Sequence, residues 1–339
     1  MKSSAINGKK IFCLFGLKQI EKQFRKIVSQ SEGVIKRKDI EYLHRMRVAS
    51  RKMLNLLITF RNCLPASKQK LWTEQVKSLA RSLGKARDTD VQILFLKDFD
   101  SHLQSEQLHA GVQRFRLRLE QKRDLQQAKI IKAIDKFTRS DFLRKGSVSI
   151  RKKVKGKRLI RKYLSDIGFI DIVLSAVRRR ISSVLSFNPV ILDPENKKEL
   201  HEFRKVNKLL RYTLETFRPV FGDRLNLFSV KLDEIHESVG LIHDCDVWVE
   251  DVQSFIEEEK QRVIAFYGSD SPFNDLLPGL EYLRKEREKL RKAEFEKFRE
   301  NWIQLNRINF WGELLKTLRE FRAEVVSGNL SAHASKPIL

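Results

Sequence analysis

Two segments of the sequence carry the same row of basic side chains. They read LHRMRVASRKMLNLLITFR in the first half of the chain and LHEFRKVNKLLRYTLETFR in the second. A helix turns by about 100° per residue, so each row would lie along one face of a helix. Arginine suits phosphate because its planar guanidinium offers paired donors, and a protonated histidine can donate as well. The two predicted phosphate-binding rows are His44, Arg47, Arg51 and Arg61, and His201, Arg204, Lys208, Arg211 and Arg218.

A second motif follows each row, as LGKARDTDV in the first half and VGLIHDCDV in the second. We expect Gly84 to end one helix in a left-handed C-cap and Asp88 to begin the next as its N-cap. Arg87 and His243 would then lie at helix N-termini, where the helix dipole favours anions. We interpret Asp88 and Asp244 as caps and as partners of Arg or His, and expect no metal site. The other candidate cations are Arg81, Lys85 and Lys231.

Both motifs recur in order, at offsets of 157 and 156 residues, which indicates an internal repeat. A single basic helix face is usually only a solvated surface, whereas its recurrence in register favours a functional face. The low glycine and proline contents, 14 and 7 of 339 residues, favour long helices. We therefore predict an all-α fold of two pseudo-symmetric four-helix bundles with a central basic groove.

The repeat divides the chain into the elements that must position these rows. Residues 1–150 would form the first bundle and residues 151–322 the second, with a solvated connector at 145–158 and a flexible tail at 323–339. The expected helices are at about 17–31, 38–62, 68–84 and 88–143, broken near Ser101, and at about 157–187, 194–218, 223–240 and 244–325. A turn-rich insertion at 267–278 would interrupt the last helix, after which 280–321 reads as one uninterrupted helix.

The charge balance is strongly basic, with 68 Lys and Arg against 43 Asp and Glu, a formal net charge of +25 and a pI near 10.0. Such a field attracts nucleic acid, an anionic membrane surface or an inorganic polyanion. Nucleic acid is the first expectation for a basic protein taken at random. However, the chain has no glycine-aromatic RNA motif and no zinc pattern.

An enzyme is the third possibility. His44 and His201 could act as acid or base in phosphoanhydride cleavage, with Asp88 or Asp244 holding a metal ion. Hydrolysis of this kind needs carboxylates clustered for Mg²⁺ within the basic face, and the two rows contain none. We therefore expect a binding protein, with nucleic-acid binding and metal-dependent hydrolysis as its alternatives.

The cysteines indicate a reducing compartment. Cys13, Cys63 and Cys245 are odd in number, far apart and without paired metal-site spacing, so we expect three free thiols. The apolar run at 11–17 lacks a following small-residue cleavage site and is interpreted as a packed helix or strand. No stretch approaches 18 uncharged apolar residues, which excludes a membrane span. These features predict a cytoplasmic protein.

The two motifs together resemble the pattern of the CHAD domain, the conserved histidine α-helical domain. In the first half the matching residues are His44, Arg47, Val48, Arg51, Leu83, Gly84, Arg87, Asp88, Asp90 and Val91. In the second half they are His201, Arg204, Lys208, Arg211 and Tyr212. Leu54 and Leu209 depart from the pattern, because the family often has a basic residue at these positions.

The resemblance covers residues 17–322 and implies one domain over 1–322. It implies two four-helix bundles related by a pseudo-twofold axis, with a basic groove or pore between them. It further implies binding of inorganic polyphosphate without catalysis and without a cofactor. Polyphosphate granules and polyphosphate-metabolising enzymes are the partners that such a protein would have.

Overall fold

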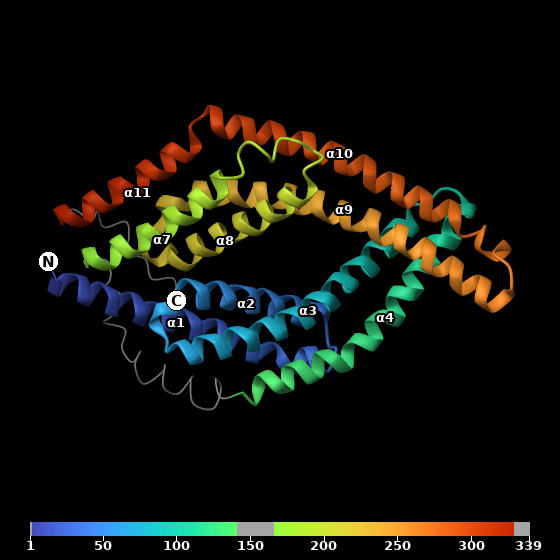
Figure 1. The fold of residues 1–339 in the computed structure, drawn as a ribbon, viewed down its shortest axis with the longest axis horizontal. Helices are drawn as coiled ribbons and strands as arrows, with labels where there is room; N and C mark the ends of the chain where they lie inside the picture. Colours follow the sequence, from blue (N-terminus) through green and yellow to red (C-terminus); the bar gives the residue numbers. More distant parts are fainter. Residues whose placement is uncertain (1, 141–165, 329–339) are drawn as a thin grey trace.

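The computed structural model describes residues 2–140 and 166–328, and they form long helices joined by short turns and loops (Figure 1). This confirms the predicted all-α fold. The helices are α1 (Lys2–Ile35), α2 (Ile40–Thr59), η1 (Arg61–Cys63), α3 (Ala66–Ser101), α4 (Glu106–Thr138), α7 (Ile167–Leu185), α8 (Lys197–Phe221), η3 (Gly222–Leu225), α9 (Asn226–Tyr267), η4 (Ser271–Phe273), α10 (Leu277–Arg307) and α11 (Phe310–Ser327). None of the described helices combines the length and the apolar character that a bilayer span requires.

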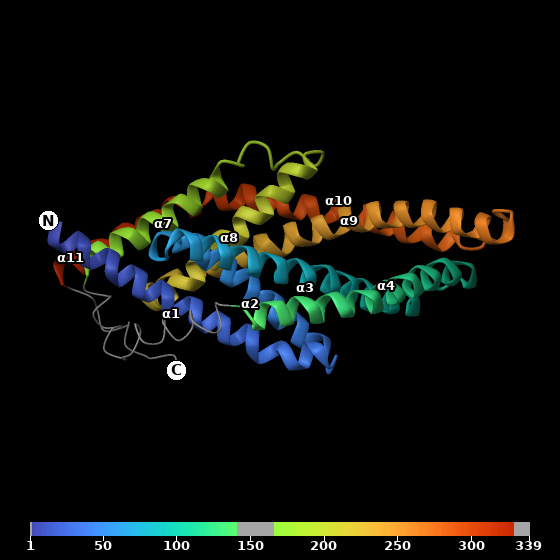
Figure 2. The ribbon, with the colours of Figure 1, turned by 60° about the horizontal axis from the view of Figure 1, so that its bottom comes forward.

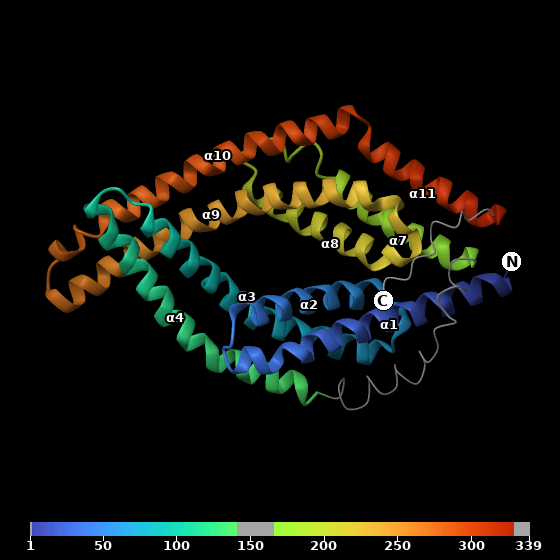
Figure 3. The ribbon, with the colours of Figure 1, turned by 180° about the vertical axis from the view of Figure 1, so that it is seen from behind.

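The buried hydrophobic side chains form two clusters at opposite ends of the molecule. The larger cluster joins both halves of the chain, and in it the rings of Phe60 and Phe217 lie 6.0 Å apart. The smaller cluster joins the α3–α4 and α9–α10 hairpins, and in it Phe115 stacks on Phe255 at 4.3 Å. The two hairpins extend toward the same end of the molecule (Figures 1 and 2). α2 contacts α8 near the middle of the molecule (Figure 3).

The two hairpins meet at a crossing of α4 and α10 that is made by two glycines. A Cβ atom on Gly111 would lie 2.0 Å from the Leu276 carbonyl oxygen, and one on Gly279 would lie 2.0 Å from the Leu108 carbonyl oxygen. Real Cβ atoms do not approach oxygen this closely, so the backbones touch here because neither residue has a side chain. The crossing closes the end of the molecule that lies away from the larger core.

Each hairpin also contains a buried ion pair between its two helices. Arg123 of α4 donates through Nε to Asp90 of α3 at 2.7 Å. Arg291 of α10 donates through Nε to Asp246 of α9 at 2.5 Å. The aspartates belong to the repeated motif, whereas their arginine partners lie outside it and were not predicted. These pairs hold the hairpins together beside the second motif.

Asp90→Ala is expected to lower the free energy of unfolding by about 3–5 kcal/mol, because it leaves the buried Arg123 guanidinium without its carboxylate. Urea denaturation followed by circular dichroism measures this. The double variant Asp90→Ala/Arg123→Met removes both charges and should regain most of the loss. A single variant as stable as the parent protein would contradict a structural role for the pair.

The predicted helix breaks at the second motif are wrong. α3 continues through Gly84 to Ser101, and α9 continues through Gly240 to Tyr267. Glycine in a helix interior costs only about 1 kcal/mol relative to alanine, and packing along these long helices outweighs that. Asp88 and Asp244 are therefore not N-caps, and Arg87 and His243 do not lie at helix N-termini.

Other predicted boundaries have different outcomes. The break near Ser101 and the interruption at 267–278 are confirmed. The single helix at 280–321 is wrong, because Asn309 adopts a left-handed conformation (φ 54°) and separates α10 from α11. The tail predicted from residue 323 is helical to Ser327, and its end lies outside the described residues, as does the connector at 145–158.

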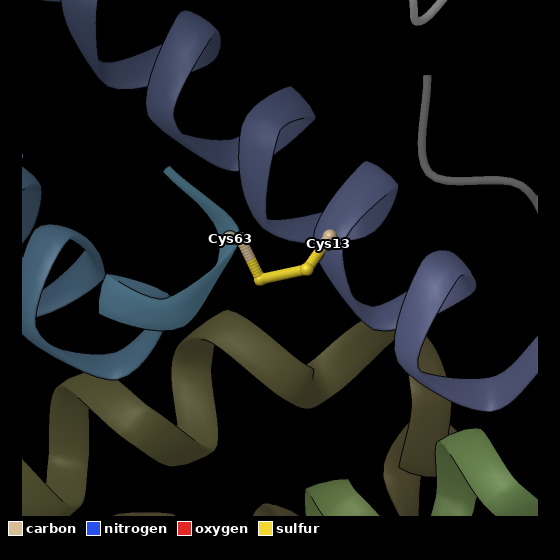
Figure 4. Close-up of a disulfide and its surroundings, with 2 residues drawn as sticks. All are labelled: Cys13 and Cys63. Atoms are coloured by element: carbon tan, nitrogen blue, oxygen red, sulfur yellow. A yellow bond between two sulfur atoms is a disulfide. The ribbon is translucent and has the colours of Figure 1, made fainter. Parts of the chain in front are cut away.

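The prediction of three free thiols is wrong. Cys13 of α1 and Cys63 of η1 form a disulfide (Figure 4), with Cα atoms 5.0 Å apart. α1 begins at Lys2, well before the helix start predicted at residue 17, and this places the half-buried Cys13 beside η1, which follows α2. Cys245 is free and buried. The inference of a reducing compartment rested on free thiols and loses that support.

Candidate anion-binding site

A cavity of about 700 Å³ lies between the two hydrophobic clusters, with walls from α2, α3, α4, α8 and α9. We call it the central cavity. Nine of the fourteen predicted site residues line it, and they come from both halves of the chain. These nine are His44, Arg47, Arg51, Lys85, Arg87, His201, Arg204, Lys208 and His243. The other lining cations are Lys122 and Lys205, so eight lysines and arginines face three aspartates, Asp88, Asp244 and Asp251.

Two arginines at equivalent positions of the basic rows are only partly neutralised. Arg47 donates through Nη2 to Asp88 at 3.0 Å, and the Nη2 of Arg204 lies 4.0 Å from Asp244. The bridging role predicted for these aspartates is thus confirmed. The Nε atoms of Arg47 and Arg204 are buried and have no hydrogen-bond partner. Buried donors of this kind need an acceptor, and an anion in the cavity would supply one.

Lys208 is the most perturbed cation of the cavity. Burial lowers the pKa of its ammonium group to about 7, and Arg51, Arg204 and Arg47 add to this effect by repulsion. No carboxylate of the described residues forms an ion pair with Lys208 or with Arg51. An anion among these groups would offset the repulsion and favour the protonated amine.

The histidines of the cavity are held in their neutral forms. Burial, followed by the charge of Arg204, lowers the pKa of His243 to about 4. The Nδ1 atoms of His201 and His243 lie 3.1 Å apart, so one ring must donate and the other accept. Burial also lowers the pKa of His44, with Arg87 adding to the effect. Protonation of these histidines is thus disfavoured in the ligand-free protein, and their donation to a bound phosphate stays a prediction.

Two predicted site residues of α8, Arg211 and Arg218, line a different cavity of about 380 Å³. Arg211 donates to Asp233, and the Nη2 of Arg218 lies 3.8 Å from Asp223. Both residues share a helix face with Arg204 but lie about 10 and 21 Å further along the axis. They are neutralised by carboxylates and are not part of the central cavity.

The three remaining predicted residues also lie away from the central cavity. Arg61 is exposed on η1 because α2 ends at Thr59, so the helical spacing that related it to Arg47 does not apply. Arg81 is exposed on α3, one turn before Lys85. Lys231 is exposed on α9 and forms an ion pair with Glu234 at 2.8 Å.

Sequence reasoning missed several residues at the cavity. Lys122 and Gln126 reach it from α4, outside both repeated motifs, and no pattern in the sequence marks them. Lys205 lies next to Arg204 in the second basic row and could have been found there. His236 of α9 is also missing from the prediction, and burial lowers its pKa to about 3, with repulsion from Arg211 and Arg204 next.

Comparisons with known proteins agree with this architecture. The family model of the CHAD domain matches residues 18–253. A structure titled PptA from Streptomyces chartreusis is 13% identical, with a TM-score of 0.56, and the match covers 86% of this chain and 98% of that one. The crystal structure of the CHAD domain from the plant Ricinus communis is 17% identical, with a TM-score of 0.54, covering 87% of this chain and 91% of that one. No curated protein matches. The family match spans well over half of the sequence, and the chain belongs to the CHAD domain family.

Proposed function

We propose that this chain binds inorganic polyphosphate in the central cavity and does not cleave it. The observation that carries the proposal is the excess of half-buried, under-neutralised cations contributed by both halves of the chain, above all Arg47, Arg51, Arg204 and Lys208. Polyphosphate is a linear anion with a charge on every phosphate, and arginine forks match its oxygens. Membership of the CHAD family supports the same ligand.

The chemistry of the cavity favours a polyanion without bases. Nucleic acid bound in a single-stranded form is held partly by stacking of bases on exposed aromatic side chains. The aromatic residue in the cavity lining is Trp248, which is 6% exposed and packs on Phe95 at 4.9 Å. It is not placed to stack on a base. Association with polyphosphate granules or with polyphosphate-metabolising enzymes stays a prediction, and so does a cytoplasmic location.

A competition titration tests the proposal. Fluorescent long-chain polyphosphate would be displaced from the protein by unlabelled polyphosphate, single-stranded RNA and duplex DNA at matched charge. Polyphosphate should compete best, and raising salt from about 50 to about 200 mM should weaken its binding by roughly 10³-fold, because each neutralised phosphate releases counterions. If nucleic acid competes better at every salt concentration, the protein is a nucleic-acid-binding protein instead.

Non-catalytic binding is tested separately by release of inorganic phosphate. Polyphosphate incubated with the protein and Mg²⁺ is expected to keep its chain length on a gel and to release no phosphate above the protein-free control. Phosphate release that disappears in Asp88→Asn or Asp244→Asn variants would instead support the hydrolase alternative, because these aspartates line the central cavity and face Arg47 and Arg204.

A further inference from the structure

A second cavity, of about 650 Å³, lies between α4 and α9 and adjoins the central cavity. We call it the side trough. The two cavities share four lining residues, Lys85, Lys122, Gln126 and Asp251, so they lie side by side. A ligand that leaves the central cavity past these four residues would enter the side trough.

The side trough offers cations that are free to bind. Lys122 and Lys129 of α4 are exposed, and neither forms an ion pair with a described residue. They lie seven residues apart, which places them on one face of α4 at a separation of about 10 Å. Arg118, one turn before Lys122, is instead held by the buried carboxylate of Glu259 at 3.0 Å. The two lysines thus continue the basic lining outward from the central cavity.

The side trough also contains carboxylates, but each of them has a partner other than Lys122 or Lys129. Asp251 lies at the junction of the two cavities and accepts a hydrogen bond from Gln92 at 2.6 Å. Glu258 forms an ion pair with Arg262 at 2.7 Å. Glu259 is fully buried beneath its arginines. The accessible positive charge of the trough therefore comes from lysines that lack such partners.

The opposite side of the molecule has no equivalent lining. Arg123 of α4 and Arg291 of α10 each pair with an aspartate of the second motif, and Gly111 and Gly279 make equivalent close contacts. Both comparisons relate α4 to α10 at an offset of 168 residues. At this offset Leu290 stands for Lys122, Glu294 for Gln126 and Lys297 for Lys129. In α9, Leu241 stands for Lys85 at the offset of the second motif. The basic continuation is therefore present on one side of the central cavity.

The opposite side is also packed with aromatic side chains. Phe95 of α3 stands at the position equivalent to Asp251, and its ring lies 4.9 Å from that of Trp248. The guanidinium of Arg287 lies over the Phe95 ring at 4.1 Å, and Phe99 packs on Tyr282 at 6.0 Å. An apolar cluster thus stands where the α4–α9 side has its trough.

We propose that the side trough is a one-sided extension of the central cavity, in which Lys122 and Lys129 hold the part of a long linear polyphosphate that leaves the cavity between α4 and α9. The inference rests on the proposed function. It assigns a direction to the ligand, because on the repeat-related side a leucine replaces Lys122, the remaining Lys297 lies 3.8 Å from Glu294, and Arg287 stacks on Phe95. It also predicts selectivity for long over short chains.

The experiment compares tripolyphosphate with long-chain polyphosphate by isothermal titration calorimetry on the full chain. Lys122→Glu/Lys129→Glu should weaken long-chain binding about tenfold or more, and reduce the slope of log affinity against log salt by about one unit per lysine. Tripolyphosphate binding should change less than twofold. Lys297→Glu is the matched control for the single variant Lys129→Glu, because both reverse one charge at repeat-equivalent positions, and Lys297→Glu should leave both affinities unchanged.

Three results would overturn the inference. The first is equal weakening of both ligands by the double variant, which would mean that the lysines act only through the general field of the protein. The second is an equal effect of Lys297→Glu, and the third is no effect of the double variant. Failure of the unmodified protein to bind either ligand would instead refute the proposed function. Lys122→Gln/Lys129→Gln, which avoids new carboxylates, should give the same selectivity with a smaller effect.

Discussion

Lys208→Glu is expected to abolish tight polyphosphate binding while leaving the protein folded. The new carboxylate would lie among Arg47, Arg51 and Arg204, where it gains partners that the lysine lacks. The same carboxylate repels an incoming polyanion at the centre of the cavity. Placing like charges together in this way costs about 3 kcal/mol or more, which corresponds to about a hundredfold in Kd.

Binding and stability should therefore change in opposite directions. Fluorescence anisotropy with labelled polyphosphate measures the affinity, and thermal denaturation measures the stability, which we expect to be unchanged or raised. Lys231→Glu is the matched control, since Lys231 carries the same charge on the surface, outside the cavity, and should bind as the parent protein does. A Lys208→Glu protein that is folded and binds with the parent affinity would show that the ligand site is elsewhere.

Polyphosphate binding is expected to take up protons near neutral pH. Burial and neighbouring arginines lower the pKa of Lys208 from 10.5 to about 7 in the free protein, and a bound anion raises it again. Because the ligand prefers the protonated amine, affinity should fall as pH rises above about 7, by up to tenfold per pH unit for one linked proton. Calorimetry at about pH 8 in buffers of different ionisation enthalpy measures the uptake.

The same linkage has the opposite sign for folding. The unfolded chain binds a proton at Lys208 that the free folded protein has lost, so this group raises the free energy of unfolding as pH increases from about 7 to about 10.5. The charged and titratable groups around Lys208 are Arg47 and Arg51 of α2, His201, Arg204 and Lys205 of α8, and His236 and His243 of α9. Lys208→Met should remove the proton uptake, and uptake that persists in this variant would assign the proton to another of these groups.

Helix type and number were largely predictable from the sequence, whereas helix continuity was not. The motif around Gly84 has the composition of a helix end, yet α3 runs through it. Glycine favours a left-handed C-cap but is also tolerated in a long packed helix, and local sequence does not distinguish the two. The left-handed glycines of the described residues are Gly222, Gly268 and Gly328, and Gly268 ends α9 within the turn-rich insertion that the sequence did predict.

The sequence predicted which side chains of each basic row share a helix face, but not how far along the helix that face lines the cavity. Helical spacing brings Arg47 and Arg51 of one half together with Arg204 and Lys208 of the other at the central cavity. The same spacing does not say where along its axis a helix leaves the cavity, which is why Arg211 lies at a different cavity from Arg204. The contribution of α4 was not predictable, because Lys122 has leucine at its repeat-equivalent position and the search for repeats passes over it.

The contact between Gly111 and Gly279 has a consequence for the width of the binding site. The two backbones already touch there, so any side chain at either residue would act as a spacer between α4 and α10. The opposite ends of α3, α4, α9 and α10 pack in the larger core. A side chain at the crossing would therefore push the two hairpins apart at one end only. The width of the central cavity should thus depend on two residues that do not line it and that act by lacking side chains.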